Sequence, residues 1–336
     1  MRTRIVHILF MTLLFTVCVQ GSLAHTPLKP GPDNESLETA YAVSDPTKSW
    51  AIYADLHEGG EAQYYRLDLE EGDRLRAMLY VPISENSDFM PNLIVMGLGI
   101  SSEDTVPAYV EVPDGAGTML VTAQRSAQPS YEPFTPSSYY YLASMDQEIS
   151  LTGTYYVAVY EESQGGRYGL AIGYREEFGI DEWILVPIDT IGIHQWEGQS
   201  LEFILAPILA TFVIGLSVAI WKRTPMSRAA FYWTGISAGL LYVGSGVTIL
   251  TQMILALSTS TPDFSALLTL IFVMLPILLG AAILRIVAKK RKSITKRSRL
   301  FLALLGLSGL FAWAGLIIGP ILSVLTSILP VKLSES

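Results

Sequence analysis

Two histidines are the first residues in this sequence that could carry acid–base or metal chemistry. Of the four in the chain, His7 lies in an N-terminal apolar stretch and His25 follows it, which leaves His57 and His194. Neither has a partner residue at the spacing of a known nucleophile motif. No His-x-x-x-His pair, P-loop or dinucleotide fingerprint accompanies them. We therefore expect a protein without catalytic activity, although a serine hydrolase or metallohydrolase assembled from distant residues stays open.

Carboxylates gather near two predicted turns and could bind a cation. Glu58 and Glu61 belong to the first turn, and Glu70, Glu71 and Asp73 belong to the second. Calcium takes carboxylate and backbone carbonyl oxygens, so Glu70, Glu71 and Asp73 are candidate calcium ligands. The chain has no Asp-x-Asp-x-Asp-Gly loop, and turn carboxylates are often only solvated. Calcium is the cofactor that the sequence suggests, and plain solvation is the alternative.

The segment 129–141 combines prolines with aromatic residues. Prolines preorganise an extended loop, and exposed tyrosines offer rigid contact area at a small cost in entropy. We expect this segment to bind a glycan or a surface protein. The candidate ligand-binding residues are Tyr131, Phe134, Tyr139, Tyr140 and Tyr141. In the alternative, Phe134 and Tyr140 fold back onto the domain.

These candidate residues all belong to a strongly acidic half of the chain. Residues 25–200 contain 28 Asp and Glu but only 8 Lys and Arg, while residues 201–336 contain 3 acidic and 12 basic residues. The overall net charge of −9 therefore conceals two halves of opposite charge. An acidic surface disfavours nucleic acids and anionic lipid surfaces. We expect a solvated domain outside the cytoplasm and no nucleic-acid partner.

The N-terminus has the pattern of a secretory signal peptide. Arg2 and Arg4 precede an apolar run, and small residues follow up to Ala24. The run is shorter than the ~20 residues that span a bilayer. We therefore predict a signal peptide over 1–24 that is removed, with an uncleaved anchor as the alternative. Cys18, the only cysteine, would leave with it, which excludes disulfides and metal thiolates from the mature chain.

Four apolar segments in the basic half are long enough to cross a bilayer. They are 201–221, 229–257, 266–287 and 300–329. Basic residues, among them Lys222, Arg223 and Lys289, occupy the first and third connecting loops, whereas 258–265 contains no Lys or Arg. Because basic loops stay in the cytoplasm, we predict a multi-pass cell-membrane protein whose N-terminal domain and C-terminus both lie outside the cytoplasm.

The predicted spans contain small-residue spacings rather than ionisable groups. No Asp, Glu, His or Lys lies deep in any of them, which argues against proton relays and ion pathways. Two glycine pairs, Gly235 with Gly239 and Gly315 with Gly319, permit close helix packing. They pack this chain's own bundle, or else they form the seam of a homo-oligomer or of a contact with another membrane protein.

Short segments of alternating polarity precede the spans. A polar segment, 25–48, leads into 49–175, where we expect strands at 65–69, 75–81, 92–96, 108–112, 118–123, 155–160 and 167–172. Many short strands separated by turns predict a β-sandwich rather than a βαβ fold. The juxtamembrane segment 176–200 contains an apolar stretch too short to span. We expect it to lie flat in the membrane interface, with a last strand of the sandwich as the alternative.

Two parts of the sandwich resemble a known family. The stretch GEAQYYRLDLEEGD over 60–73 resembles the opening hairpin of bacterial and archaeal pre-peptidase C-terminal domains, and GTYYVAVY over 153–160 with GRYGL over 166–170 is similar to that family's last hairpin. The match covers 35–173, and its middle, 101–142, is longer than the family pattern. The resemblance implies a non-catalytic, jelly-roll-like sandwich used for binding or as a secretion accessory.

The expected fold is therefore an all-β jelly-roll-like sandwich followed by an α-helical four-span transmembrane bundle. We expect a membrane-anchored module outside the cytoplasm that binds a ligand or assembles at the surface without catalysis. The alternative is an accessory subunit of a membrane transport or respiratory complex. Exposure of 131–141 would favour the first function, and partner contacts through Gly235 and Gly315 would favour the second.

Overall fold

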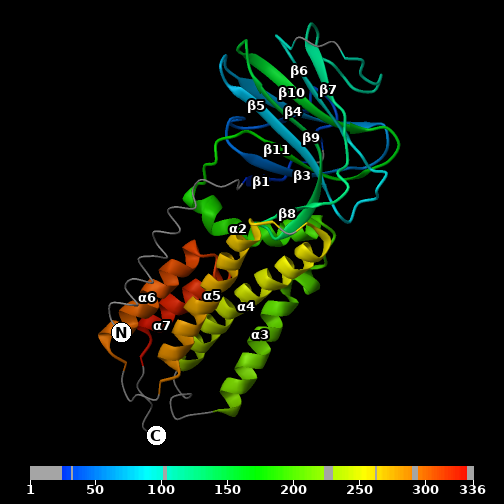
Figure 1. The fold of residues 1–336 in the computed structure, drawn as a ribbon. Helices are drawn as coiled ribbons and strands as arrows, with labels where there is room; N and C mark the ends of the chain where they lie inside the picture. Colours follow the sequence, from blue (N-terminus) through cyan, green and yellow to red (C-terminus); the bar gives the residue numbers. More distant parts are fainter. Residues whose placement is uncertain are drawn as a thin grey trace.

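Two β-sheets followed by six helices make up the part of the chain that the computed structural model describes. The described residues are 25–31, 33–100, 104–222, 230–261, 263–289 and 294–330. The sheets form one body and the long helices another, stacked end to end (Figure 1). The predicted signal peptide, 1–24, lies outside the described residues.

The strands form a sandwich of a six-stranded and a five-stranded sheet. The order in the first sheet is β1 (Thr26–Leu28), β3 (Trp50–Leu56), β11 (Gly166–Ile172), β5 (Arg74–Pro82), β9 (Ser137–Glu148) and β8 (Ser130–Glu132). The order in the second is β2 (Tyr41–Ala42), β4 (Glu61–Leu69), β10 (Gly153–Glu161), β6 (Asn92–Gly97) and β7 (Gly117–Val121). Neighbours are antiparallel except for the pairs β1–β3 and β2–β4.

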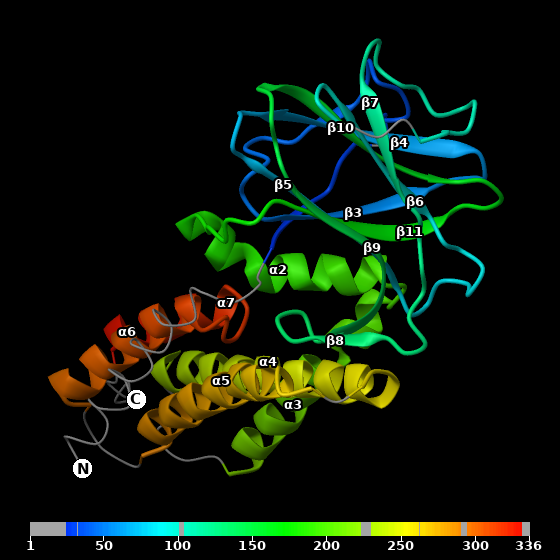
Figure 2. The same ribbon diagram turned by 45° about the horizontal axis from the view of Figure 1, so that its top comes forward.

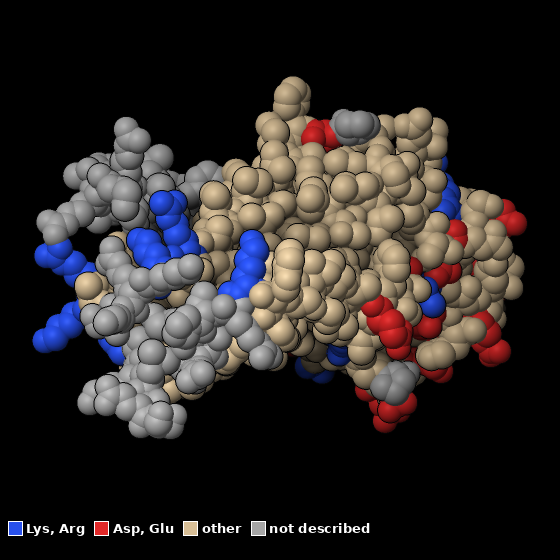
Figure 3. Space-filling model, turned by 90° about the horizontal axis from the view of Figure 1, so that it is seen from below, with Lys and Arg blue, Asp and Glu red and all other residues tan. Residues whose placement is uncertain are grey.

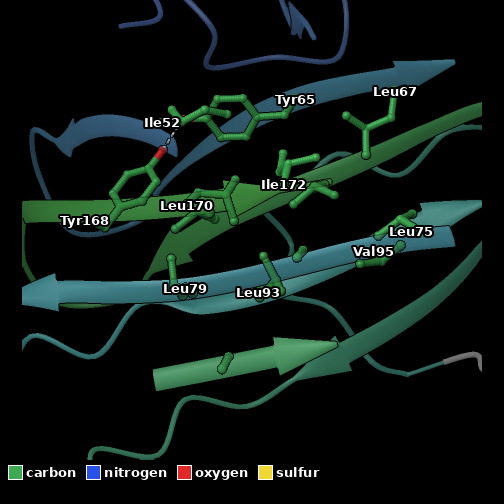
Figure 4. Packing of buried hydrophobic residues seen from close by; sticks show 14 of the residues in the cluster. Ile52, Tyr65, Leu67, Leu75, Leu79, Leu93, Val95, Tyr168, Leu170 and Ile172 are labelled. Atoms are coloured by element: carbon green, nitrogen blue, oxygen red, sulfur yellow. Dashed lines mark hydrogen bonds between the residues drawn. The ribbon is translucent and has the colours of Figure 1, made fainter. Parts of the chain in front are cut away.

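Alternating strand residues fill the space between the sheets. The buried set includes Ile52, Leu67, Leu79, Val95 and Leu170 (Figure 4). Two fully buried tyrosines cross this core, and the hydroxyls of Tyr65 and Tyr168 lie 2.6 Å apart. Tyr168 also donates to the side-chain oxygen of Gln63 at 2.6 Å. These bonds satisfy hydroxyls that would otherwise be costly to bury.

The turn at 70–73 does not close the hairpin that the resemblance implied. β4 pairs with β2 and β10, whereas β5 pairs with β9 and β11, so the turn carries the chain from one sheet to the other. The connection from β10 to β11 does the same. Each of these strands still places one face on the shared core, which is why the alternation pattern looked like that of a hairpin.

The predicted strand at 108–112 is wrong. Pro107 accepts a hydrogen bond from the amide of Val110 at 2.9 Å, which makes a turn there. Val110 is buried against the outer face of the second sheet, and the amide of Glu111 donates to the hydroxyl of Tyr64 at 2.6 Å. The segment therefore covers that sheet without joining it.

Three helices are long and apolar enough to cross a membrane, and all three were predicted. They are α3 (Leu201–Trp221), α4 (Ala230–Thr259) and α5 (Ala266–Val287). Lys and Arg gather at the end of the helices that is remote from the sandwich, while Asp and Glu gather on the sandwich (Figure 3). Lys222 follows α3 and Lys289 follows α5, so both lie at this basic end.

The predicted fourth span, 300–329, is two short helices instead of one. α6 (Lys296–Phe311) and α7 (Ile318–Ile328) have 16 and 11 residues, and neither spans the ~30 Å of a bilayer core alone. Three residues between them, Trp313, Gly315 and Leu316, have positive φ angles and reverse the chain. Arg299 at the start of α6 donates to the carbonyl of Leu329 at 2.8 Å. The described chain therefore returns to the basic end at Leu329, and the prediction of one continuous spanning helix over 300–329 is wrong.

The juxtamembrane segment forms a helix, so the alternative of a last strand is wrong. α2 (Ile180–Trp196) lies across the junction between the sandwich and the long helices (Figure 2). The side chain of Glu182 accepts from the amide of Gly179 at 2.6 Å, which caps the helix, and also pairs with Lys48 at 2.6 Å. Ile180, Leu185 and Ile188 leave a row of exposed apolar side chains on this helix.

Candidate ligand-binding site

The tyrosine-rich segment 129–141 is built into the junction between sandwich and helices. It forms β8 and the start of β9. Neither strand was predicted from the sequence. The hydroxyl of Tyr131 donates to Thr269 of α5 at 2.7 Å, and Ser138 donates to the carbonyl of Ala256 in α4 at 2.8 Å. Tyr131 is only 7% exposed and Tyr139 only 3%. The loop was expected to be free, and these two residues are instead buried within the chain's own contacts.

Helix α2 makes the second set of contacts at the junction. The indole of Trp196 donates to the carbonyl of Ala54 in β3 at 3.0 Å. At the other end of α2, the indole of Trp183 donates to Phe311, and the indole of Trp313 donates back to Trp183 at 2.9 Å. The sandwich, α2 and the α6–α7 connection are therefore joined directly.

A cavity of about 70 Å³, here called the upper cavity, lies between the sandwich, α2 and the loop after β8. One wall is a group of tyrosines on the outer face of the first sheet, formed by Tyr53, Tyr80, Tyr139 and Tyr141. The ring of Tyr80 lies 4.9 Å from that of Tyr139 and 5.8 Å from that of Tyr141. These rings present an aromatic surface to the cavity.

Three further aromatic residues line the upper cavity. Trp183 and Trp313 line it with their ring centroids 4.7 Å apart. Phe134, from the loop after β8, packs against Phe272 of α5 at 5.9 Å and closes the wall toward the membrane helices. An aromatic lining of this kind suits a cation, and it also suits a flat or apolar group.

The charges in the upper cavity are carboxylates. Glu132 and Asp189 line it, and no Lys or Arg is among the described residues that do so. His25 also lines it, but burial, helped by the nearby charge of Arg76, lowers the pKa of its imidazole to about 4, so it is uncharged near neutral pH. Burial also raises the pKa of Asp189, an effect that the charge of Lys29 partly offsets. Among the described side chains that line the cavity, only carboxyl groups can therefore be charged near neutral pH.

Glu132 is the least compensated of these groups. One carboxylate oxygen accepts from the amide of Phe134 at 3.1 Å, and none of the ion pairs formed between described residues involves it. Burial, with a smaller contribution from Glu197, raises its pKa to about 7 against an ordinary value of 4.5. Strongly shifted carboxyl groups in a cavity are common at functional sites.

A second cavity of about 80 Å³, the lower cavity, adjoins the first one on the side of the helices. It lies among α2, α3, α4 and α5, and its walls are mainly aliphatic. Phe134, Val186, Thr190 and Trp313 line both cavities. A polar, aromatic chamber at the sandwich is thus adjacent to an apolar chamber in the bundle.

A buried polar cluster links the end of α2 to β9 beside these cavities. Glu197 accepts from the hydroxyl of Tyr139 at 2.5 Å and lies 2.8 Å from Nδ1 of His194. Behind it, the side-chain amides of Gln199 and Gln252 bond to each other in both directions at 3.0 and 2.8 Å. One of the two candidate histidines, His194, is therefore a structural partner of Glu197.

The predicted calcium ligands do not gather around a common point. Glu70 and Glu71 are exposed, and Asp73 accepts from the amide of Glu70 at 2.8 Å, so it stabilises its own turn. Elsewhere on the sandwich, possible ligand atoms of Glu35, His57 and Glu61 lie within 4.8 Å of one another, with both Glu35 and His57 exposed. Exposed groups of this kind are common without a metal ion.

All four candidate packing glycines meet atoms of the same chain. A side chain at Gly235 would contact Val287 of α5, and one at Gly239 would contact Leu284. Gly315 and Gly319 both lie against the ring of Tyr242. These positions face the interior of the bundle, which leaves the proposed seam with a second copy or a partner protein without support.

Helix α4 contains a sequence that matches a hydrolase motif. Residues Gly235 to Gly239 read Gly-Ile-Ser-Ala-Gly, which matches the Gly-x-Ser-x-Gly pattern of hydrolases. That pattern requires a sharp strand-to-helix turn at the serine. Here the whole stretch lies inside continuous helix α4, so Ser237 is not displayed as a nucleophile.

Three of the five candidate aromatic residues line the upper cavity, but Tyr53, Tyr80, Trp183 and Trp313, which also line it, were not candidates. Tyr139, Tyr141 and Phe134 were candidates, whereas Glu132 and Asp189 were not. The available signal was a glutamate between two prolines in an aromatic segment, and an aspartate in an apolar one. In comparisons with known proteins, no family model matches the chain, and no curated protein is similar to it.

Proposed function

We propose that this protein is a membrane-anchored binding protein, without catalytic activity, whose ligand site is the upper cavity at the junction of sandwich and helices. The observation that carries the proposal is Glu132, a carboxylate without an ion-pair partner among the described residues, held in an aromatic cavity. Burying such a group is costly unless something compensates it, and a ligand would do so. The four tyrosines and two tryptophans supply the contact surface.

The sandwich is proposed to lie outside the cytoplasm. The basic residues at the remote end of the helices support this orientation, because Lys and Arg near the ends of spans favour the cytoplasmic side. The exposed apolar residues of α2 would then lie in the outer membrane interface. The site would open at the level of the lipid headgroups.

The relation of the sandwich to pre-peptidase C-terminal domains stays a proposal. Two packed, mainly antiparallel sheets are compatible with a jelly-roll-like sandwich, and a binding role is compatible with that family. The accessory-subunit function has less support, because its expected contact glycines face inward.

Native mass spectrometry of the full chain, released from its own membrane, tests the binding function. Thr190 lines both cavities, so T190W should fill them, whereas Ile188 is an exposed residue of the same helix and I188W is the matched control. We expect a bound small molecule on the wild type and on I188W, and its loss from T190W. Equal retention by all three proteins would contradict the proposed site.

A further inference from the structure

We propose that the ligand of the upper cavity is an ammonium group, and that this group is the head of an amphiphile whose apolar part enters the lower cavity. The inference rests on the proposed binding function and names the class of ligand. Each part of it depends on a separate feature of the two cavities.

The charged groups that line the upper cavity indicate the sign of the ligand's charge. Its described lining contains two carboxylates, no Lys or Arg, and a histidine that is uncharged near neutral pH. An anion would meet Glu132, which has no ion-pair partner among the described residues, and this is unfavourable in a poorly solvated site. A cation would compensate Glu132, while Asp189 already has Lys29 nearby.

The aromatic walls favour an organic cation over a metal ion. Calcium and magnesium need about six oxygen ligands in an ordered shell. The upper cavity offers two carboxylates, and aromatic residues that include Tyr53, Tyr80 and Trp183 make up much of the rest of its lining. Such faces attract ammonium groups, and quaternary ammonium compounds are bound in aromatic cages of this kind. Burial also raises the pKa of the Tyr53 and Tyr80 phenols, so both remain neutral and keep a hydroxyl proton.

The lower cavity indicates an apolar extension of the ligand. Four residues line both chambers, so a molecule in one is in contact with the walls of the other. The lower walls include Ile204, Leu205 and Ile249 from α3 and α4, which suit an aliphatic chain. A free amine would use only the upper chamber, whereas a lipid or another amphiphile would use both.

The test uses the full chain in nanodiscs of phosphatidylglycerol, with two probes added separately. Soluble tetramethylammonium represents a free ammonium compound, and phosphatidylethanolamine in the bilayer represents an ammonium-bearing lipid. Tryptophan fluorescence reports the first, since Trp183 and Trp313 line the cavity. Native mass spectrometry counts the retained lipid for the second.

We expect saturable binding of at least one probe by the wild type. E132Q keeps the size of the side chain and removes its charge, so affinity should fall about 10- to 100-fold. D189N should have a smaller effect, and E71Q, at an exposed glutamate of the sandwich, should have none. If only tetramethylammonium binds, the site takes a soluble ammonium compound, and the inference of an amphiphile is wrong. If phosphatidylethanolamine is retained, the whole inference is supported.

Failure of this inference can be told apart from failure of the binding function. If T190W loses a ligand that is anionic or neutral, and E132Q retains it as the wild type does, the ammonium assignment is wrong and the cavity is still a site. If neither probe binds and T190W behaves as the wild type, both proposals are wrong. Thermal unfolding of each variant checks that the fold is intact.

Discussion

Tyr131 and Thr269 are 138 residues apart in the sequence, and the hydroxyl of Tyr131 donates to that of Thr269 over 2.7 Å. The first residue belongs to β8 and the second to α5, so this bond joins the sandwich to a membrane helix. The hydroxyl of Thr269 in turn donates a hydrogen bond to the carbonyl of Pro133, also at 2.7 Å. The contact holds the end of β8, which carries Glu132, and so it positions one wall of the upper cavity.

Tyr131→Phe should loosen the junction without unfolding the sandwich. The substitution removes a buried hydrogen bond, which stabilises by about 1 kcal/mol, while Thr269 keeps its bond to Pro133. We expect faster amide hydrogen exchange across 129–141 and unchanged exchange in β4 and β10. Tyr174→Phe, at a more exposed tyrosine, is the control. Unchanged exchange in the 129–141 segment would show that this bond does not hold the junction.

Gly309→Ala should destabilise the helical half. A side chain at Gly309 would overlap the phenol of Tyr242, whose hydroxyl donates to the carbonyl of Leu305 at 3.0 Å. Overpacking of this kind costs roughly 1–3 kcal/mol, and loss of that bond adds to it. Gly153→Ala has open space around it and should be close to neutral. Thermal unfolding in detergent measures both, and equal midpoints would refute the tight packing around Tyr242.

The ionisation of Glu132 should make the free energy of unfolding depend on pH. Its pKa is raised from 4.5 to about 7 by burial, so the folded protein retains a proton that the unfolded chain releases between these values. The contribution of Glu132 to the free energy of unfolding is therefore fully present below pH 4.5 and is lost as the pH rises to about 7. E132Q, which cannot ionise, should gain up to about 3 kcal/mol over the wild type between pH 4 and pH 8.

Comparing the wild type with E132Q separates the effect of Glu132 on stability from the effects of neighbouring groups that also titrate. Asp189 also has a raised pKa and acts in the same direction, whereas His25 has a lowered pKa and acts in the opposite one. Both are present in the wild type and in E132Q, so their effects cancel in the difference. Parallel stability curves for the two proteins would mean that Glu132 titrates normally.

Single cysteines should place the C-terminal end beside the basic loops. Lys296→Cys and Pro330→Cys lie at the two ends of the α6–α7 hairpin, and Glu71→Cys lies on the sandwich. In intact cells, a membrane-impermeant maleimide should label only Glu71→Cys. After permeabilisation, all three should react. Labelling of Pro330→Cys together with Glu71→Cys in intact cells would require a complete fourth span.

The division into a sandwich and apolar helices was predictable, since it depends on local patterns. Alternating polarity marked β4, β5 and β10, and long apolar runs marked α3, α4 and α5. The segment 300–329 was as apolar as these, and hydropathy cannot register that Gly315 and Trp313 adopt left-handed backbone angles. That reversal depends on contacts with Trp183 and Tyr242, which are distant in the sequence.

The site itself was only partly predictable, because its two halves come from different domains. Tyr139 and Tyr141 drew attention as aromatic residues beside prolines, and they were expected to be exposed. They lie on β9 beside Tyr80 of the neighbouring strand β5, and Trp196 of α2 packs against this group. Glu132 acquires its properties only from this burial, and no local pattern carries that information.

A cryo-electron microscopy map of the full chain in a nanodisc of its native lipids would test the central claim most directly. We predict a docked sandwich, with non-protein density in the upper cavity within hydrogen-bond distance of the Glu132 carboxylate and between the tyrosines and Trp183. The density should continue past Phe134 into the lower cavity. A sandwich that is free of α4 and α5, or an upper cavity that holds only water, would contradict the account.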